Sequence, residues 1–139
     1  MVELRRVWKV YAVGAVKVPA LSDVSFRIAK GEMVLVTGTS GAGKTTLLRL
    51  LYRDDLPTEG EVEVLGRAVT TLRGSQVAEL RRSIGIVFQD AKLLPGRTVY
   101  ENIAFVLRVL GTPRRDITQR VFEALRAVGM SEFALLDGT

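Results

Sequence analysis

A glycine-rich stretch, residues 38–45, carries the residue types that bind phosphate groups. It reads Gly-Thr-Ser-Gly-Ala-Gly-Lys-Thr, which fits the pattern of a glycine, four residues and then Gly-Lys-Thr. Glycines let the backbone wrap closely around a polyphosphate, and N–H groups at a helix N-terminus attract anions. We expect Lys44 to reach the β- and γ-phosphates and the Thr45 hydroxyl to hold Mg²⁺. An ordinary glycine turn followed by a lysine is the simpler alternative. The predicted phosphate-binding residues are Gly38, Thr39, Ser40, Gly41, Ala42, Gly43, Lys44, Thr45 and Thr46.

Two apolar runs flank this loop and predict the elements that position it. The continuous run at residues 33–37 predicts a strand that is covered on both faces. The run that follows the loop predicts a helix from about Lys44 to Tyr52. The residues expected on its buried face are Leu47, Leu48 and Leu51.

The segments on either side of this strand–loop–helix unit predict further strands. Residues 2–11 are rich in Val, Leu, Trp and Tyr and predict a strand, and residues 14–19 predict a hairpin or loop. Apolar and polar residues alternate over 24–28, as in a half-buried antiparallel strand. Residues 61–66 predict a short strand whose valines face one way.

The second half of the chain predicts a buried strand followed by helices. Residues 84–88 form an apolar run that ends at Gln89, and a loop follows. Thr98 and Glu101 form a capping box at the start of a helix, and another helix is expected over 114–128. The residues expected on their buried faces are Val99, Ile103, Val106, Leu107, Leu110, Ile117, Val121, Leu125 and Val128.

The composition limits the chemistry. The 139 residues include no cysteine and no histidine, which excludes thiolate and imidazole chemistry and favours a hard, oxygen-bound ion such as Mg²⁺. No signal peptide or membrane-spanning run is expected. The net charge of +5 indicates a solvated basic surface or attraction to an acidic partner or membrane surface. The arginines are scattered, so no nucleic-acid partner is expected.

The order of these markers resembles the nucleotide-binding domain of ABC-type ATPases over essentially the whole chain. The resemblance implies an α/β fold, a P-loop NTPase core with an antiparallel β insertion and the start of a helical subdomain. It implies an ATP-binding core with the β subdomain at residues 1–90, and a Q-loop with a partial helical subdomain at 91–139.

The resemblance also implies roles for two residues outside the loop. Tyr11 lies where that family has the aromatic residue that stacks on adenine, although Trp8 or an ordinary strand tyrosine is the alternative. Gln89 matches the glutamine that contacts Mg²⁺ and the attacking water, so Lys44 and Gln89 are the expected catalytic residues. Thr45 and Gln89 are the expected metal ligands, with ATP and Mg²⁺ as cofactors.

Two segments carry a likeness to the cell-division branch of the family. They are residues 50–60 and 87–102, although lipoprotein-release and macrolide-export ATPases share much of both. The likeness implies an integral membrane subunit that docks on residues 91–102, although Leu93, Leu94 and Pro95 are equally expected only to pack the helical subdomain. It also implies a homodimer of the intact protein, located in the cytoplasm on the inner face of the cell membrane.

Three motifs of the family are missing from residues 1–139. They are the Leu-Ser-Gly-Gly signature, the Walker B Asp-Glu and the switch histidine. Residues 133–137 look superficially like a Walker B strand, but Gly138 follows where the glutamate is expected. We therefore expect part of an ABC domain that binds ATP weakly and hydrolyses it negligibly. A non-hydrolysing, ATP-dependent docking module is the second hypothesis, and GTPases and nucleoside kinases are disfavoured.

Overall fold

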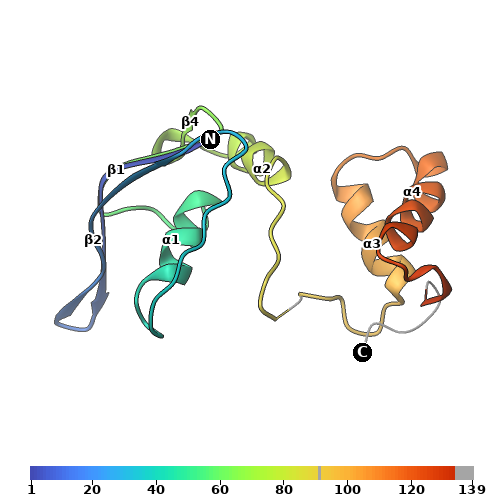
Figure 1. Ribbon diagram of the computed structural model, residues 1–139, viewed down its shortest axis with the longest axis horizontal. Coiled ribbons are helices and arrows are strands. Elements are labelled where there is room, and N and C mark those ends of the chain that lie inside the picture. Colours follow the sequence, from blue (N-terminus) through green and yellow to red (C-terminus); the bar gives the residue numbers. More distant parts are fainter. Residues whose placement is uncertain (91, 134–139) are drawn as a thin grey trace. The chain divides into compact units, whose positions relative to one another are not determined.

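The computed structural model describes residues 1–90 and 92–133. They belong to two compact units, Met1–Gly85 and Ile86–Thr139, which are described separately (Figure 1). The predicted functional boundary between residues 90 and 91 stays a prediction.

The first unit contains an antiparallel sheet with the strand order β2-β1-β3-β4. The strands are β1 (Val2–Val13), β2 (Val16–Ile28), β3 (Glu59–Val64) and β4 (Arg67–Ala68). The long β1–β2 hairpin is visible in Figure 1, where α1 lies beside it. β2 begins inside the stretch predicted as a hairpin or loop, because the turn needs only the two residues between Val13 and Val16. The antiparallel pairing predicted for residues 24–28 is confirmed.

Helices α1 (Lys44–Leu51) and α2 (Ser75–Arg82) complete this unit, together with the short 3₁₀ helix η1 (Val69–Thr71). α1 buries Leu47 and Leu50 in the same apolar cluster as the sheet residues Leu4, Val7 and Leu21. Leu48 is exposed, so its predicted burial is wrong. Leu47 and Leu50 are three positions apart and share one face of the helix, whereas Leu48 is rotated away from that face.

The predicted strands at 33–37 and 84–88 are wrong for this structure. Neither segment is paired with another strand among the described residues. Most of their side chains lie open to solvent, with Met33 97% exposed and Val87 100% exposed, whereas Ile84 is partly buried against the core of the first unit. An apolar run has the propensity for a buried strand, but a strand also needs a hydrogen-bonded neighbour to satisfy its backbone.

The second unit pairs α3 (Val99–Val109) with α4 (Arg114–Ala127), followed by the 3₁₀ helix η2 (Ser131–Phe133). The core of the unit contains Ala104, Ile117, Val121 and Leu125. Partly buried residues, among them Val99, Ile103 and Leu107, pack against it. The predictions for Val106, Leu110 and Val128 are wrong, because all three are exposed. The predicted capping box is confirmed: Glu101 N–H donates to the Thr98 hydroxyl at 3.1 Å, and Thr98 N–H donates to Glu101 Oε2 at 3.0 Å.

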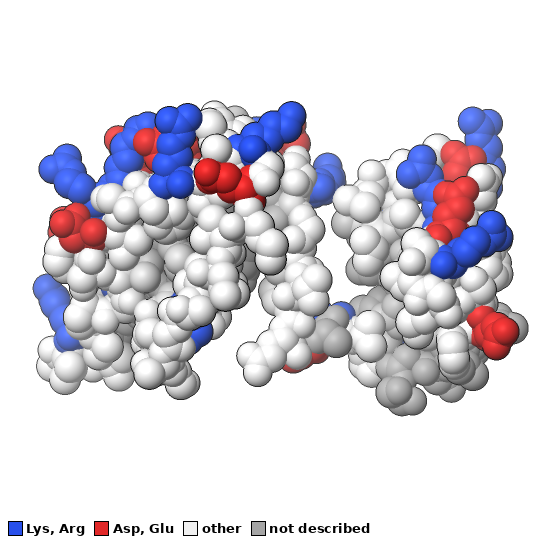
Figure 2. All heavy atoms as spheres, viewed as in Figure 1, with Lys and Arg blue, Asp and Glu red and all other residues white. Residues whose placement is uncertain are grey.

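The charged side chains of both signs are interspersed on the visible face of each unit. Figure 2 shows no separate basic or acidic patch on these faces. The interpretation of the net charge of +5, as a solvated basic surface or as attraction to an acidic partner or membrane surface, stays a prediction. Within the described ranges, we find no helix that is both long enough and apolar enough to span a bilayer.

Candidate functional site

The glycine-rich loop leads directly into the N-terminus of α1. Gly41 and Gly43 have φ values of 81° and 85°, a left-handed conformation that residues with a Cβ rarely adopt. Gly43 is the N-cap of α1, and the first hydrogen bond of the helix runs from Leu47 N–H to Gly43 O at 2.8 Å. No side chain caps this end and no acidic residue lies in the first turn. The first N–H groups of the helix are therefore open to an anion.

Gly43 also fixes the loop against β2. A Cβ on Gly43 would lie 2.3 Å from Ala20 O and 3.1 Å from Leu21 Cδ2. Only glycine permits so close an approach of two backbone segments. This contact places the loop next to the middle of β2.

The Lys44 side chain folds back over the loop. Its Nζ donates hydrogen bonds to Gly38 O and Thr39 O, both at 2.7 Å. An ammonium group has three donors, so these two bonds orient Lys44 and leave one N–H for an anion. Thr45 follows in the first turn of α1 and is exposed, which leaves its hydroxyl accessible to a ligand. Lys44 and Thr45 thus lie together at the start of α1, and phosphate binding by residues 38–46 stays a prediction.

Tyr11 lies on the strand next to the one that the loop contacts. Leu21 of β2 pairs with Lys9 of β1, and Tyr11 is two residues further along and pairs with Val18. The register shifts between Lys9 and Val10, but Lys9 Nζ lies 4.8 Å from the centroid of the Tyr11 ring, so the two side chains lie on the same face. The pairing register therefore connects Tyr11 to the loop through a single neighbouring strand.

An acidic side chain holds the Tyr11 hydroxyl. Tyr11 O–H donates to Asp55 Oδ2 at 2.8 Å, and Lys9 Nζ donates to Asp55 Oδ1 at 2.5 Å. Partial burial raises the pKa of the Asp55 carboxyl, but hydrogen bonds from Lys9, Tyr11 and Leu56 N–H outweigh it, and the net pKa is below the ordinary value. Lys9 and Asp55 are not among the site residues predicted from the sequence. Lys9 could have been predicted from its position two residues before Tyr11 on the same strand. Nothing in the sequence indicates the role of Asp55.

Gln89 lies in the second unit, in a turn with Asp90 that follows the extended segment 84–88. Lys92 forms an ion pair with Asp90, and this pair lowers the pKa of the Asp90 carboxyl. The role of Gln89 at the phosphate loop stays a prediction. The Walker B-like residues 134–137 lie outside the described residues.

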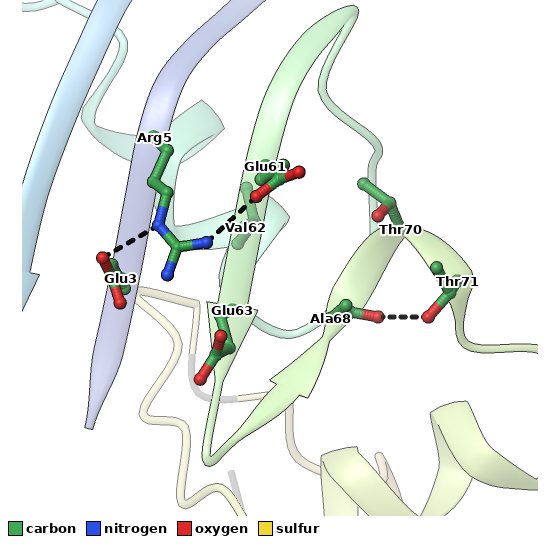
Figure 3. A pocket seen from close by; sticks show the side chains of 8 residues that line it. All are labelled: Glu3, Arg5, Glu61, Val62, Glu63, Ala68, Thr70 and Thr71. Carbon is green, nitrogen blue, oxygen red and sulfur yellow. Dashed lines mark hydrogen bonds and ion pairs between the residues drawn. The ribbon is translucent and has the colours of Figure 1, made fainter.

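The sheet carries a pocket that contains none of the predicted site residues. Its volume is about 240 Å³, and Figure 3 shows its lining side chains. Arg5 donates to Glu3 at 2.9 Å and to Glu61 at 3.1 Å, and Glu63 lies beside them. Three carboxylates around one guanidinium repel a polyphosphate, so this pocket is not part of the candidate site.

The second unit has a pocket of about 400 Å³ in the region predicted to dock a partner. Its lining residues are Leu94, Pro95, Arg97, Glu101, Phe105 and Arg108. Phe105 is 46% exposed at this pocket. Arg97 pairs with Glu101 at 3.1 Å, so the lining combines charged groups with the apolar side chains of Leu94, Pro95 and Phe105.

Comparison with known proteins gives a consistent match. The sequence model of the family described as "ABC transporter" matches residues 21–136. The chain is 42% identical over 134 residues to "Cell division ATP-binding protein FtsE" of Bacillus subtilis, covering 96% of this chain and 58% of that protein. It is 44% identical over 134 residues to "Methionine import ATP-binding protein MetN 3" of Oceanobacillus iheyensis, covering 96% of this chain and 39% of that protein. The chain thus spans about half the length of these relatives.

Solved structures show the same fold. A dimeric ATP-binding cassette in a post-hydrolysis state, bound to ADP and Pi, superposes with a TM-score of 0.87 at 33% identity. That match covers 99% of this chain and 62% of the other. A dimeric bacterial ABC transporter cassette superposes with a TM-score of 0.89 at 32% identity, covering 99% of this chain and 61% of the other. The predicted fold class, a P-loop core with an antiparallel β insertion and the start of a helical subdomain, is confirmed.

Proposed function

The chain belongs to the ABC transporter family, and from this premise we propose that residues 38–46 bind the phosphates of ATP. The observation that carries the proposal is the position of Lys44. Its ammonium is held by two carbonyls of the loop, next to the uncapped N-terminus of α1. A fixed cation and free backbone donors at one place form a binding site for a polyphosphate.

Mg²⁺ would be held by the Thr45 hydroxyl and Gln89. Hydroxyl and amide oxygens are the hard ligands that this ion prefers, and Thr45 lies beside Lys44 at the start of α1. The ion supplies positive charge that neutralises phosphate oxygens. In this proposal Lys44 orients the same oxygens, and Gln89 senses the γ-phosphate and positions the attacking water.

The adenine base would stack on Tyr11. The β1–β2 register places Tyr11 one strand away from the contact of Gly43 with Ala20, and its hydroxyl is fixed by Asp55. An immobilised ring loses little freedom when a base stacks on it.

For the intact protein we propose a Mg-ATPase that couples ATP binding and hydrolysis to a membrane partner. The FtsE relatives favour a role in cell division with an FtsX-like integral membrane subunit, and the MetN relatives favour import as the second candidate. Both kinds of protein are recorded as ATP-binding by name. A lipoprotein-release or export ATPase, or a docking module without turnover, remains the further alternative.

The partner would dock on residues 91–102 and α3. Leu94, Pro95 and Phe105 contribute apolar side chains to the lining of the pocket. Arg97, Glu101 and Arg108 contribute charged groups that could fix the orientation of a partner. The dimeric solved cassettes support a homodimer of the intact protein. Docking would keep the protein at the inner face of the cell membrane.

A phosphate-release assay with Mg²⁺ and ATP tests turnover by this chain. Residues 1–139 contain no signature and no Walker B motif, so we expect ATP binding without steady release of phosphate. Lys44→Ala is the control for release by a contaminating enzyme. Steady release by the wild-type chain that Lys44→Ala abolishes would contradict the proposal that this chain does not turn over ATP.

A further inference from the structure

Tyr11 is one member of a three-residue cluster with Lys9 and Asp55. Both carboxylate oxygens of Asp55 are engaged, Oδ1 by Lys9 Nζ at 2.5 Å and Oδ2 by Tyr11 O–H at 2.8 Å. Leu56 N–H also donates to Asp55 Oδ1 at 2.7 Å. The side chains of Lys9 and Asp55 are only 12% and 18% exposed. Salt screens an ion pair with so little solvent contact much less than it screens a surface pair.

Lys9 also covers the ring of Tyr11. Its Nζ lies 4.8 Å from the ring centroid, within the range of a cation–π interaction, and donates to Leu56 O at 2.8 Å. The phenol is thus fixed at its hydroxyl and covered on one face. The Tyr11 side chain is only half-buried, so part of its ring is accessible to a flat ligand.

The turn that carries Asp55 follows directly after α1, the helix that begins at the phosphate loop. Asp54 N–H and Asp55 N–H donate to Arg49 O at 2.9 and 3.3 Å, which continues the end of the helix into the turn. Thr58 N–H then donates to Trp8 O at 2.7 Å, and Val10 N–H donates to the Thr58 hydroxyl at 3.0 Å. The turn is therefore bonded to β1 on both sides of Lys9. The eight residues of α1 span roughly 12 Å at 1.5 Å per residue, so one short, rigid element connects the loop to the anchor of Tyr11.

We propose that Asp55 and Lys9 are positioning residues that hold the Tyr11 ring at a set distance from the phosphate loop and thereby select ligands that carry a base. This inference rests on the proposed function, since it needs a polyphosphate at residues 38–46. The hydrogen bonds that connect the end of α1 to Asp55, and Asp55 to Tyr11, fix the position of the ring relative to the phosphate loop. If Lys9 and Asp55 only stabilised the fold, replacing them would change the affinity for all ligands equally.

The affinities for two ligands distinguish a positioning role of Asp55 and Lys9 from a purely structural one. The probes are ATP and inorganic tripolyphosphate, each with Mg²⁺, titrated into the 139-residue chain. Tyr11→Phe keeps the ring and removes only its hydroxyl, Asp55→Asn removes the anion, and Lys9→Met removes the cation. We expect each to weaken ATP binding about 3- to 10-fold, the effect of one lost hydrogen bond, with tripolyphosphate affinity changed less than about 2-fold.

Two further variants serve as controls. Arg5, like Lys9, is a cation on β1, and it bridges the carboxylates of Glu3 and Glu61 in the pocket of Figure 3. Arg5→Gln removes this cation and should leave the affinities for ATP and tripolyphosphate unchanged. Lys9→Arg keeps the charge and should preserve the preference for ATP. Circular dichroism and urea unfolding verify that each variant is folded, and Tyr11→Phe is the mildest change if Asp55→Asn does not fold.

The titrations can contradict the positioning role alone or the proposed function as well. Equal loss of ATP and tripolyphosphate affinity, or unchanged ATP affinity in Tyr11→Phe and Asp55→Asn, would overturn the positioning role. If the wild-type chain binds tripolyphosphate as tightly as ATP, the phosphate site stands and this inference fails. If it binds neither ligand, the proposed function fails, and the inference fails with it.

Discussion

The side chain of Asn102 binds the backbone of Leu94, eight residues earlier in the chain. Its Oδ1 accepts a hydrogen bond from Leu94 N–H at 2.7 Å. Its Nδ2 donates to Leu94 O at 3.5 Å, to Arg97 O at 3.2 Å and to Thr98 O at 3.0 Å. One amide in the first turns of α3 thus organises the loop that forms one wall of the second pocket.

Replacing Asn102 should loosen this loop. Asn102→Ala leaves part-buried backbone groups without partners, and we expect a loss of about 1–3 kcal/mol in the stability of this unit. Asn102→Asp is the matched control, because it keeps an acceptor for Leu94 N–H and loses the donors. Amide hydrogen exchange at Leu94 should therefore accelerate strongly in Asn102→Ala and much less in Asn102→Asp. Equal protection of Leu94 in the wild type and Asn102→Ala would contradict the proposed clamp.

Alanine substitutions at two glycines of the phosphate loop should lower the free energy of unfolding by different amounts. Gly41→Ala meets no atom within 4 Å, so it should cost only the left-handed conformation, about 1–2 kcal/mol. Gly43→Ala has nearly the same φ but places its Cβ 2.3 Å from Ala20 O, so overpacking should add about 1–3 kcal/mol. Urea unfolding monitored by the fluorescence of Trp8 measures both. Equal free energies of unfolding for the two variants would show that the contact with β2 is not maintained.

The capping box predicts a pH dependence of α3. The hydrogen bond from Thr98 N–H and the one from Arg97 lower the pKa of the Glu101 carboxyl. A lowered pKa in the folded state means that Glu101 stabilises the unit above the ordinary glutamate pKa of about 4.3, and that this contribution is lost as the pH falls through the lowered value. Glu101→Gln keeps an acceptor and cannot ionise there. Helicity measured by circular dichroism from pH 7 to 3 should fall more in the wild type than in this variant, and parallel curves would exclude the effect.

The second pocket predicts a variant that affects partner binding alone. Phe105→Asp places a charge among the apolar side chains that line it, which should weaken docking of the membrane subunit in the full-length protein, since an apolar contact becomes a buried charge. Co-purification with a co-expressed FtsX-like subunit measures docking, and ATP binding is the internal control. Phe122→Asp is the matched variant, since Phe122 is similarly exposed at 41% and lies outside the pocket. Undiminished co-purification of Phe105→Asp, or equal loss in both variants, would argue against this surface.

The features predicted correctly from the sequence depend only on residues that are close together in the chain. The capping box needs only Thr98 and Glu101, and the loop needs only its glycines and Lys44, so both could be placed from spacing alone. The buried face of α4 followed from the period of Ile117, Val121 and Leu125.

The failures concern relations between distant segments. Residues 33–37 have the composition of a buried strand but no strand partner among the described residues, and composition does not reveal whether a partner exists. Val106 and Leu110 are apolar but exposed, because α4 packs against the neighbouring face of α3. Asp55 lies 44 residues from Tyr11, and only the folded arrangement of β1 and the turn after α1 joins them.

Calorimetric titration of Mg²⁺ and ATP into the wild-type chain and Lys44→Ala measures directly whether residues 38–46 bind the nucleotide. We expect saturable binding to the wild type and an affinity at least about 10-fold lower in Lys44→Ala, which loses charge-assisted hydrogen bonds to phosphate. Circular dichroism confirms that both proteins are folded. Equal affinity of the two folded proteins, or no binding by the folded wild type, would contradict the assignment of residues 38–46 as the nucleotide site.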